Sequence, residues 1–320
     1  MIDSKLKVAV LAGGIGAERE VSIESGRCVA EALKEAGLNV VTADITPDNT
    51  DILKDADIDV FFPALHGRFG EDGRLQQILK DRTLLYTTSG PPACRLAFDK
   101  IAAKKLFTEA GIDTPAAIEF SSDTDIGQLE RQLQQLADKY VVKPVRQGSS
   151  VGVRIVTEQC EVIDAAQKCL SKFGDCMIEE FIPGREIAIG ILCEQALPII
   201  EIRTERPFYD YQAKYIDEQT EFLFDTITDP ALTARIKTAA LDCFNALGCR
   251  YFARADFILS DEQKPYILEV NTIPGLTTHS LLPKAAAKAG LSMSRLCTKI
   301  IEAAIETRKT KVPKVTKTRG

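Results

Sequence analysis

Long apolar runs are missing from this sequence, and none approaches the roughly 20 residues that a membrane-spanning helix needs. The first residues, MIDSKLKVAVLAGG, also lack the basic start, the long apolar core and the small-residue cleavage site of a secretory signal. These absences predict a soluble protein that stays in the cytoplasm and has no membrane partner.

Closely spaced cysteine and histidine residues, of the kind that bind zinc, are also missing. The nine cysteines include no CxxC pair, and the only two histidines are His66 and His279. Zinc sites need clustered cysteine or histidine ligands, so we expect reduced, structural thiols and no histidine-rich metal site. A single histidine more often satisfies local hydrogen bonds than catalyses a reaction.

A net excess of positive charge is missing from this sequence except at the end of the chain. The formal net charge is -6, which argues against a nucleic-acid partner because such proteins use many cations to neutralise phosphates. Residues 308–320 are strongly basic and lack apolar periodicity. This pattern predicts a solvated, disordered tail, with a weak interaction arm as the alternative.

The length of 320 residues exceeds a single hydrophobic core and predicts several domains around shared clefts. In residues 1–95, predicted strands at 6–11, 39–43 and 60–65 alternate with predicted helices at 22–36 and 73–80. This alternation predicts an open α/β sheet, so the fold class is α/β, α+β overall.

The pattern changes near Pro91, and two further domains are predicted at 96–182 and 183–307. The first has a helix at 99–110, a strand near Ile118 and strands at 140–144, 153–156 and 177–181. The second has further strands, a long polar connection at 203–225, a helix at 229–247 and two acidic strands.

Four polar side chains mark the two acidic strands, ARADFIL at 253–259 and YILEVN at 266–271. Strand side chains alternate between faces, so Arg254 shares a face with Asp256, and Glu269 shares one with Asn271. Apolar residues at the alternate positions predict that the polar face lines a cleft. Burying two carboxylates costs several kcal/mol unless they are neutralised, which favours a magnesium site. The alternative is that Arg254 simply pairs with Asp256 or Glu269.

A glycine- and serine-rich loop follows the predicted strand that ends near Lys143. In QGSSVG, at 147–152, small residues allow backbone N–H groups to approach phosphate oxygens. Such a hairpin alone is more often a simple turn. Lys143 and the acidic strands downstream favour a phosphate-binding loop.

The stretch GIGAER at 14–19 begins like a dinucleotide-binding fingerprint, with Asp44 as a candidate ribose ligand. Arg19 occupies the position of the third glycine, where a side chain would obstruct helix packing. The sequence therefore argues against hydride-transfer chemistry and leaves Glu18 with another role.

Eight stretches in order along the chain resemble the D-alanine–D-alanine ligase family of the ATP-grasp fold. They are AGGIGAEREVSIESG, ALHGRFGEDG, FDKIAAKKLF, VVKPVRQGSSVGV, IEEFIPGREI, FYDYQAKY, ARADF and LEVNTIPGLTTHSLLPKAA. The resemblance implies an N-terminal α/β domain and two further domains that sandwich ATP.

The resemblance also implies a nucleotide site with two magnesium ions, or manganese in their place. The metal ligands would be Asp256, Glu269 and Asn271. Lys100 and Lys143 would contact phosphates, and Glu186 the ribose. The remaining nucleotide-binding residues would be Glu179, Glu180, Phe181, Ile182, Ser149 and Lys214.

For the substrates, the resemblance implies that ATP phosphorylates one D-alanine and that the amine of a second attacks the acyl phosphate. Arg254 and the Gly275 N–H would stabilise the developing charge. Glu18 would hold the first ammonium group. The other substrate-binding residues would be His66, Ser149, Tyr215, Ser280 and Leu281. Lys214 and Tyr215 would belong to a lid in the polar connection, although an aromatic hairpin is the simpler interpretation of FYDYQAKY.

Departures from the family pattern keep other functions open. Ile273 and Leu276 flank the expected second-substrate site, so the acceptor could be D-serine, D-lactate or another amino acid. A nucleotide-binding sensor without catalysis is a third hypothesis, although none of the four polar residues of the acidic strands is missing. The resemblance further implies a homodimer that supplies a peptidoglycan precursor.

Overall fold

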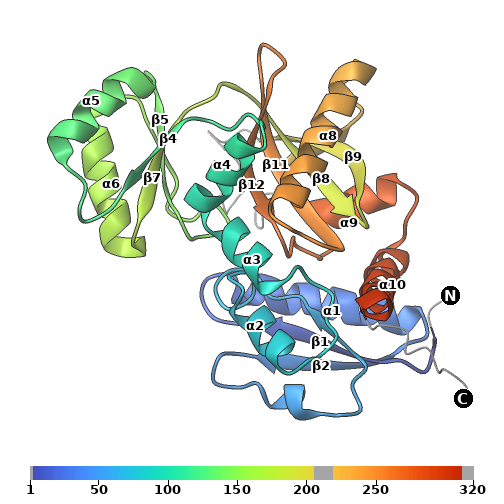
Figure 1. Cartoon of the computed structure of the whole chain (residues 1–320). Coiled ribbons are helices and arrows are strands. Elements are labelled where there is room, and N and C mark those ends of the chain that lie inside the picture. Colours follow the sequence, from blue (N-terminus) through green and yellow to red (C-terminus); the bar gives the residue numbers. More distant parts are fainter. Residues whose placement is uncertain (1–2, 205–218, 312–320) are drawn as a thin grey trace, which may run out of the picture.

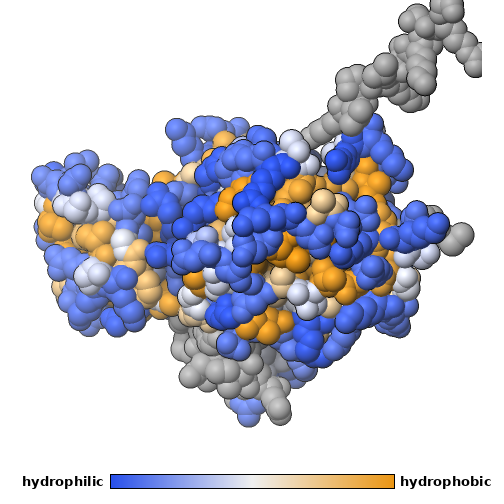
Figure 2. All heavy atoms as spheres, turned by 90° about the horizontal axis from the view of Figure 1, so that it is seen from below, coloured by the Kyte–Doolittle hydropathy of each residue, from blue (hydrophilic) through white to orange (hydrophobic). Residues whose placement is uncertain are grey.

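A computed structural model describes residues 3–204 and 219–311, which form three sheets with helices packed around them (Figure 1). Within these residues, no helix is both long enough and apolar enough to cross a membrane. On the face seen in Figure 2, apolar side chains reach the surface in patches separated by hydrophilic ones.

The first sheet is parallel, in the order β2-β1-β3, as the alternating pattern predicted. The central residues of β1, Val8 to Leu11, are fully buried, which explains their continuous apolar run. The elements are β1 (Lys7–Gly13), α1 (Arg19–Glu35), β2 (Asn39–Ile45), β3 (Val60–Pro63) and α2 (Arg74–Asp81), with a short 3-10 helix at Asp51–Lys54.

The second sheet is antiparallel, in the order β4-β7-β5-β6. Its four strands were predicted, but the two amphipathic helices that complete its core were not. The elements are β4 (Ala117–Phe120), α5 (Ile126–Leu136), β5 (Tyr140–Pro144), β6 (Arg154–Val156), α6 (Gln159–Phe173) and β7 (Cys176–Glu180).

The third sheet is antiparallel, in the order β10-β9-β8-β11-β12. Its strands are β8 (Gly184–Leu192), β9 (Gln195–Arg203), β10 (Glu221–Phe224), β11 (Phe252–Ser260) and β12 (Pro265–Asn271), and its helices are α8 (Pro230–Ala246) and α9 (Leu281–Lys288). The prediction of a continuous polar connection at 203–225 was wrong at its end. β10 pairs with β9 there because Phe222 and Phe224 pack against a buried apolar cluster.

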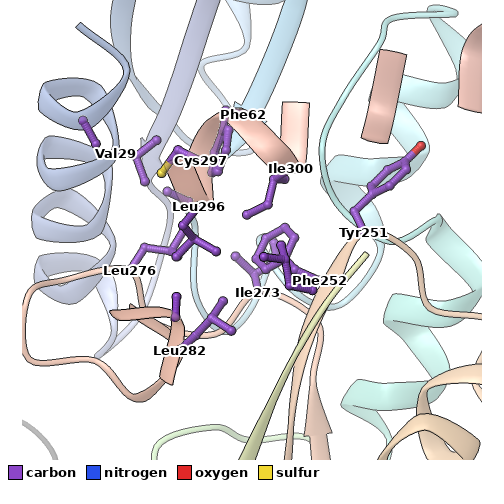
Figure 3. Close-up of a cluster of buried hydrophobic side chains, with 14 of the residues drawn as sticks. Val29, Phe62, Tyr251, Phe252, Ile273, Leu276, Leu282, Leu296, Cys297 and Ile300 are labelled. Atoms are coloured by element: carbon purple, nitrogen blue, oxygen red, sulfur yellow. The ribbon is translucent and has the colours of Figure 1, made fainter. Parts of the chain in front are cut away.

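The first and third sheets share one hydrophobic core (Figure 3). It contains Val29 of α1, Phe62 of β3 and Phe252 of β11, together with Leu296 and Ile300 of α10 (Met293–Lys311). α10 packs along α1 and carries the last described part of the chain back to the first sheet. The helix continues to Lys311, so the start of the expected disordered tail is helical.

Helices α3 (Pro91–Phe98) and α4 (Lys100–Glu109) connect the first sheet to the second. The Asp99 side chain caps α4 by accepting a hydrogen bond from the backbone N–H of Ala102 at 3.0 Å. α4 packs against β12 and α8 of the third unit. Its first turns therefore lie next to the acidic strands (Figure 1).

Candidate active site

Two cavities lie next to each other, and Glu269 lines both. The first lies between the second and third sheets and includes side chains from α4, β5, β7, β8, β11 and β12. The second lies between the start of α1, β11 and the segment that leads from β12 into α9. Residues of the second and third sheets thus meet segments that flank the first sheet at one place.

The first cavity combines an apolar lining with charged ends. It contains nearly all the residues predicted for the nucleotide: Lys100, Lys143, Glu179, Glu180, Phe181, Ile182, Glu186, Asp256 and Glu269. Ile258, two residues after Asp256 on the same face of β11, also lines it, and so does Leu268, although alternation from Glu269 placed Leu268 behind the sheet. Leu268 is left unpaired by a β-bulge next to Asp256, which turns it toward the cavity.

Glu179 is the most buried charged residue of this cavity, with a side chain that is only 2% exposed. The ammonium groups of Lys104 and Lys143 each approach one of its carboxylate oxygens at 2.5 Å. Burial favours the neutral acid, but the two lysines outweigh burial and hold the pKa of Glu179 below its usual value. Burial lowers the pKa of Lys104 to about 8, against the opposing effect of Glu179.

The acidic face has the predicted arrangement. Arg254 lies opposite Asn271, and Asp256 lies opposite Glu269, across β11 and β12. Arg254 donates two hydrogen bonds to Asp256, at 2.6 and 2.7 Å, and the Asn271 amide donates a third at 3.0 Å. Lys100 pairs with Glu269 at 3.0 Å. The ion pair between Arg254 and Asp256, which was the alternative to a magnesium site, is therefore present. Each carboxylate is neutralised by a cation.

These side chains also suit a divalent cation. Asp256 and Glu269 offer carboxylate oxygens on the same face, and the hydrogen bond from the Asn271 nitrogen leaves its oxygen as the atom suited to a metal. Over the described residues, no group of three or more His, Cys, Asp or Glu side chains is arranged so that it could hold a metal ion. The candidate metal set is thus two carboxylates and one amide.

The loop at 147–152 contributes residues to both cavities. Ser149 donates a hydrogen bond to Glu18 at 2.5 Å, and the Gln147 carbonyl accepts one from Lys100 at 2.8 Å. A Cβ at Gly148 would lie only 2.6 Å from a Glu18 oxygen, so a larger residue there would displace the Glu18 carboxylate. The predicted phosphate-binding loop therefore contacts Glu18 at the start of α1 and Lys100 at the start of α4.

The second cavity contains the predicted substrate residues that the structure describes, namely Glu18, His66, Ser149, Arg254, Gly275, Ser280 and Leu281. Several carboxylates line it, which suits ammonium groups. Ser280 is the N-cap of α9, so the positive end of that helix opens onto the cavity and suits a carboxylate.

His66 forms part of the wall of this cavity. Its Nδ1 lies 3.0 Å from the Ile273 carbonyl and its Nε2 lies 2.9 Å from the Ser25 hydroxyl. Burial lowers the pKa of His66 to about 4, so the neutral ring donates to Ile273 and accepts from Ser25. Both ring nitrogens of His66 form hydrogen bonds within the protein, which favours the interpretation that this histidine satisfies local hydrogen bonds.

Ile273 and Leu276, which kept the acceptor open, have buried side chains in the shared core (Figure 3). Arg19 forms an ion pair with Asp44, with one N–O distance of 2.9 Å. The ion pair with Arg19 therefore accounts for the carboxylate of Asp44 without a bound ribose.

Sequence reasoning missed Glu71 and Lys104. Glu71 lines the second cavity and accepts a hydrogen bond from the Gly67 N–H at 2.7 Å. Burial raises its pKa to about 8, and the neighbouring Glu18 carboxylate adds to the rise. Both residues lie inside stretches that carried the resemblance, but only their contacts with distant segments reveal them. The predicted residues Lys214 and Tyr215 lie outside the described part of the chain.

These features define an enzyme site in which a charged, apolar-walled cavity meets a second cavity suited to amino acids. Residues 106–302 match the family model described as D-ala D-ala ligase C-terminus. The chain is 40% identical over 295 residues to the D-alanine–D-alanine ligase of Hydrogenovibrio crunogenus, covering 92% of this chain and 93% of that protein. It is also 40% identical over 313 residues to that of Desulforamulus reducens, covering 94% and 99%.

Solved structures of similar fold include members of the same family. The D-alanine–D-alanine ligase of Bacillus anthracis complexed with ATP matches with a TM-score of 0.83 and 34% identity, covering 96% of this chain and all of that one. The VanG D-Ala:D-Ser ligase of Enterococcus faecalis matches with a TM-score of 0.81 and 28% identity, covering 94% and 99%. The chain belongs to the D-alanine–D-alanine ligase family.

Proposed function

We infer that this chain is an ATP-dependent D-alanine–D-alanine ligase. ATP transfers its terminal phosphoryl group to the carboxylate of one D-alanine. The amine of a second D-alanine then displaces the phosphate, which gives the dipeptide, ADP and inorganic phosphate for peptidoglycan precursor synthesis. The observation that carries this function is the junction of the two cavities at Glu269, beside Arg254, in a chain of this family.

We propose that the first cavity binds ATP. Its apolar walls suit adenine next to Glu180, Phe181 and Ile182, and Glu186 is suited to the ribose hydroxyls. Lys100 and Lys143 would hold phosphates. Asp256, Glu269 and Asn271 would hold the divalent cations, two magnesium ions by resemblance or manganese in their place. The bound cations would neutralise charge on the phosphate oxygens.

In the second cavity, Glu18 would bind the ammonium group of the first D-alanine, held in position by its hydrogen bond from Ser149. Ser280 and Leu281 at the start of α9 would bind the carboxylate of the second. Arg254 would turn from Asp256 toward the reacting carboxylate once cations neutralise Asp256. With the Gly275 N–H, it would stabilise the negative charge that develops during bond formation.

D-alanine is favoured over D-serine or D-lactate as the acceptor. The relatives at about 40% identity are D-alanine–D-alanine ligases, whereas the D-Ala:D-Ser ligase is 28% identical. Leu276 packs in the core and does not line the second cavity, whereas the buried Ile273 lies in the core and also forms part of the cavity wall. We further propose a cytoplasmic homodimer, as the resemblance implies.

The test is incubation of the purified chain with D-alanine, ATP and magnesium, with phosphate release and dipeptide measured together. Parallel reactions replace the acceptor by D-serine or D-lactate. We expect dipeptide in a one-to-one ratio with phosphate. A folded chain that releases no phosphate, or that prefers another acceptor, would contradict the proposal.

A further inference from the structure

Lys104 is a buried lysine to which the proposed reaction assigns no role. It lies one helical turn after Lys100 on the same face of α4, and its side chain is only 7% exposed. Its ammonium group donates hydrogen bonds to the Thr114 hydroxyl at 2.6 Å and to the Pro115 carbonyl at 2.7 Å. Its third contact is an ion pair with the Glu179 carboxylate, at 2.5 Å. Lys104 is thus held by two hydrogen bonds and one buried ion pair.

Two of these contacts fix Lys104 to the walls of the first cavity. Pro115 lines this cavity, and the Thr114 hydroxyl donates onward to the Ile267 carbonyl at 2.8 Å. Ile267 is in β12, the strand that carries Glu269. Lys104 is therefore held by the Thr114 hydroxyl and the Pro115 carbonyl, and it cannot turn toward a ligand without breaking these hydrogen bonds.

Lys143 has a different environment. It pairs with the second oxygen of Glu179 and lines the cavity, where the proposed ATP phosphates would bind. If Lys143 were the only partner of Glu179, its movement to a phosphate would leave a buried carboxylate without a cation, which is strongly unfavourable.

We propose that Lys104 is the fixed counter-ion of Glu179, a positioning residue that allows Lys143 to turn toward an ATP phosphate. Glu179 remains ionised and neutralised by Lys104 while Lys143 changes partner. The inference rests on the proposed use of ATP, but not on the identity of the amino acids that are joined.

The experiment compares Lys104→Met with Lys105→Met, which removes the exposed neighbouring lysine. Binding of ATP with magnesium is measured by isothermal titration calorimetry in the absence of D-alanine, and the KM values for ATP and D-alanine are measured separately. For Lys104→Met we expect ATP binding at least about tenfold weaker, which corresponds to about 1.4 kcal/mol. The KM for D-alanine should stay near that of the unaltered chain, and Lys105→Met should bind ATP normally.

A second comparison separates this role from a purely structural one. In a Glu179→Gln background the side chain needs no counter-ion, so adding Lys104→Met should change ATP affinity by less than about twofold. This double variant also removes the unpaired buried charge that could unfold the single variant. An equal loss of affinity in both backgrounds, or a single variant with lower stability but normal ATP affinity, would overturn the inference. If the unaltered chain binds ATP but makes no dipeptide, only the proposed reaction fails.

Discussion

Each carboxylate of the acidic face already has a cation beside it. Arg254 neutralises Asp256 and Lys100 neutralises Glu269, at distances of 2.6 to 3.0 Å. Buried charges require such partners when no metal is bound. We infer that these ion pairs hold the face in place until ATP and its cations replace them, so structural and catalytic interpretations of Arg254 are compatible.

Glu269→Gln tests the metal role at the junction of the cavities. The amide retains the shape of the side chain but loses the charge that attracts magnesium. We expect the magnesium concentration for half-maximal activity to rise by about 10- to 100-fold or more, with a lower kcat. The measurement is kcat against magnesium concentration, with Glu262→Gln on the exposed turn after β11 as the control. A normal rate at limiting magnesium would argue against Glu269 as a ligand.

His66 makes stability depend on pH. Its folded-state pKa of about 4 lies below the value of 6.5 for an unperturbed histidine, so on acidification the unfolded chain takes up a proton first. Stability is therefore lost as the pH falls between these two values. Urea denaturation should show a loss from His66 of about 2 kcal/mol between about pH 7 and about pH 5. His66→Asn should lack this contribution, and His279→Gln, at the exposed second histidine, should retain it; equal pH dependence in all three would refute the assignment.

At the scale of elements, helix α4 carries both Lys100 and Lys104, so its start positions two cations at once. Asp99 caps this start and also pairs with Arg146, which precedes the loop at 147–152, at 2.6 Å. The cap therefore links the helix to the loop.

Asp99→Ala removes this cap and should lower the free energy of unfolding by about 1 kcal/mol. Because α4 and the loop both line the first cavity, the KM for ATP should also rise. Asp125→Ala removes the equivalent cap of α5, whose residues do not line either cavity. It should lower stability by a similar amount with an unchanged KM for ATP. Equal KM values in the two variants would show that the start of α4 does not position the site.

At the scale of the whole molecule, the first and third sheets are joined by a common core, whereas the second sheet has its own (Figures 1 and 3). The expected boundaries at residues 95, 182 and 307 follow the order of the chain. The core shared by the first and third sheets does not follow the order of the chain, because α10 packs on α1. We propose that the first and third units unfold together.

Ile300→Ala tests this coupling. Ile300 is fully buried in the common core, and its truncation should cost about 2–5 kcal/mol. Hydrogen exchange should show reduced protection of amides in both β1 and β8, with β5 retaining most of its protection. Leu133→Ala, fully buried in the core of the second unit, should have the reverse pattern. Reduced protection of β8 alone in Ile300→Ala would contradict the shared core.

Local geometry made much of the fold readable from the sequence. The apolar run of β1 and the alternation in β11 and β12 act over a few residues, so these strands and the polar face were predicted correctly. Eight ordered motifs also indicated the family. The helices α3, α5, α6 and α9, the strand β10 and the turn of Leu268 into the cavity were missed because packing and a bulge decide them.

The sequence alone therefore determined the family, the two acidic strands and most of the charged residues that line the two cavities. The tertiary structure decided which of them meet. Glu18 and Ser149 are 131 residues apart, and His66 and Ile273 are 207 residues apart, yet each pair is hydrogen-bonded. Lys104 acquires its importance only when α4 packs beside Glu179. Contacts between such distant segments depend on how the sheets pack, which no local pattern of residues encodes.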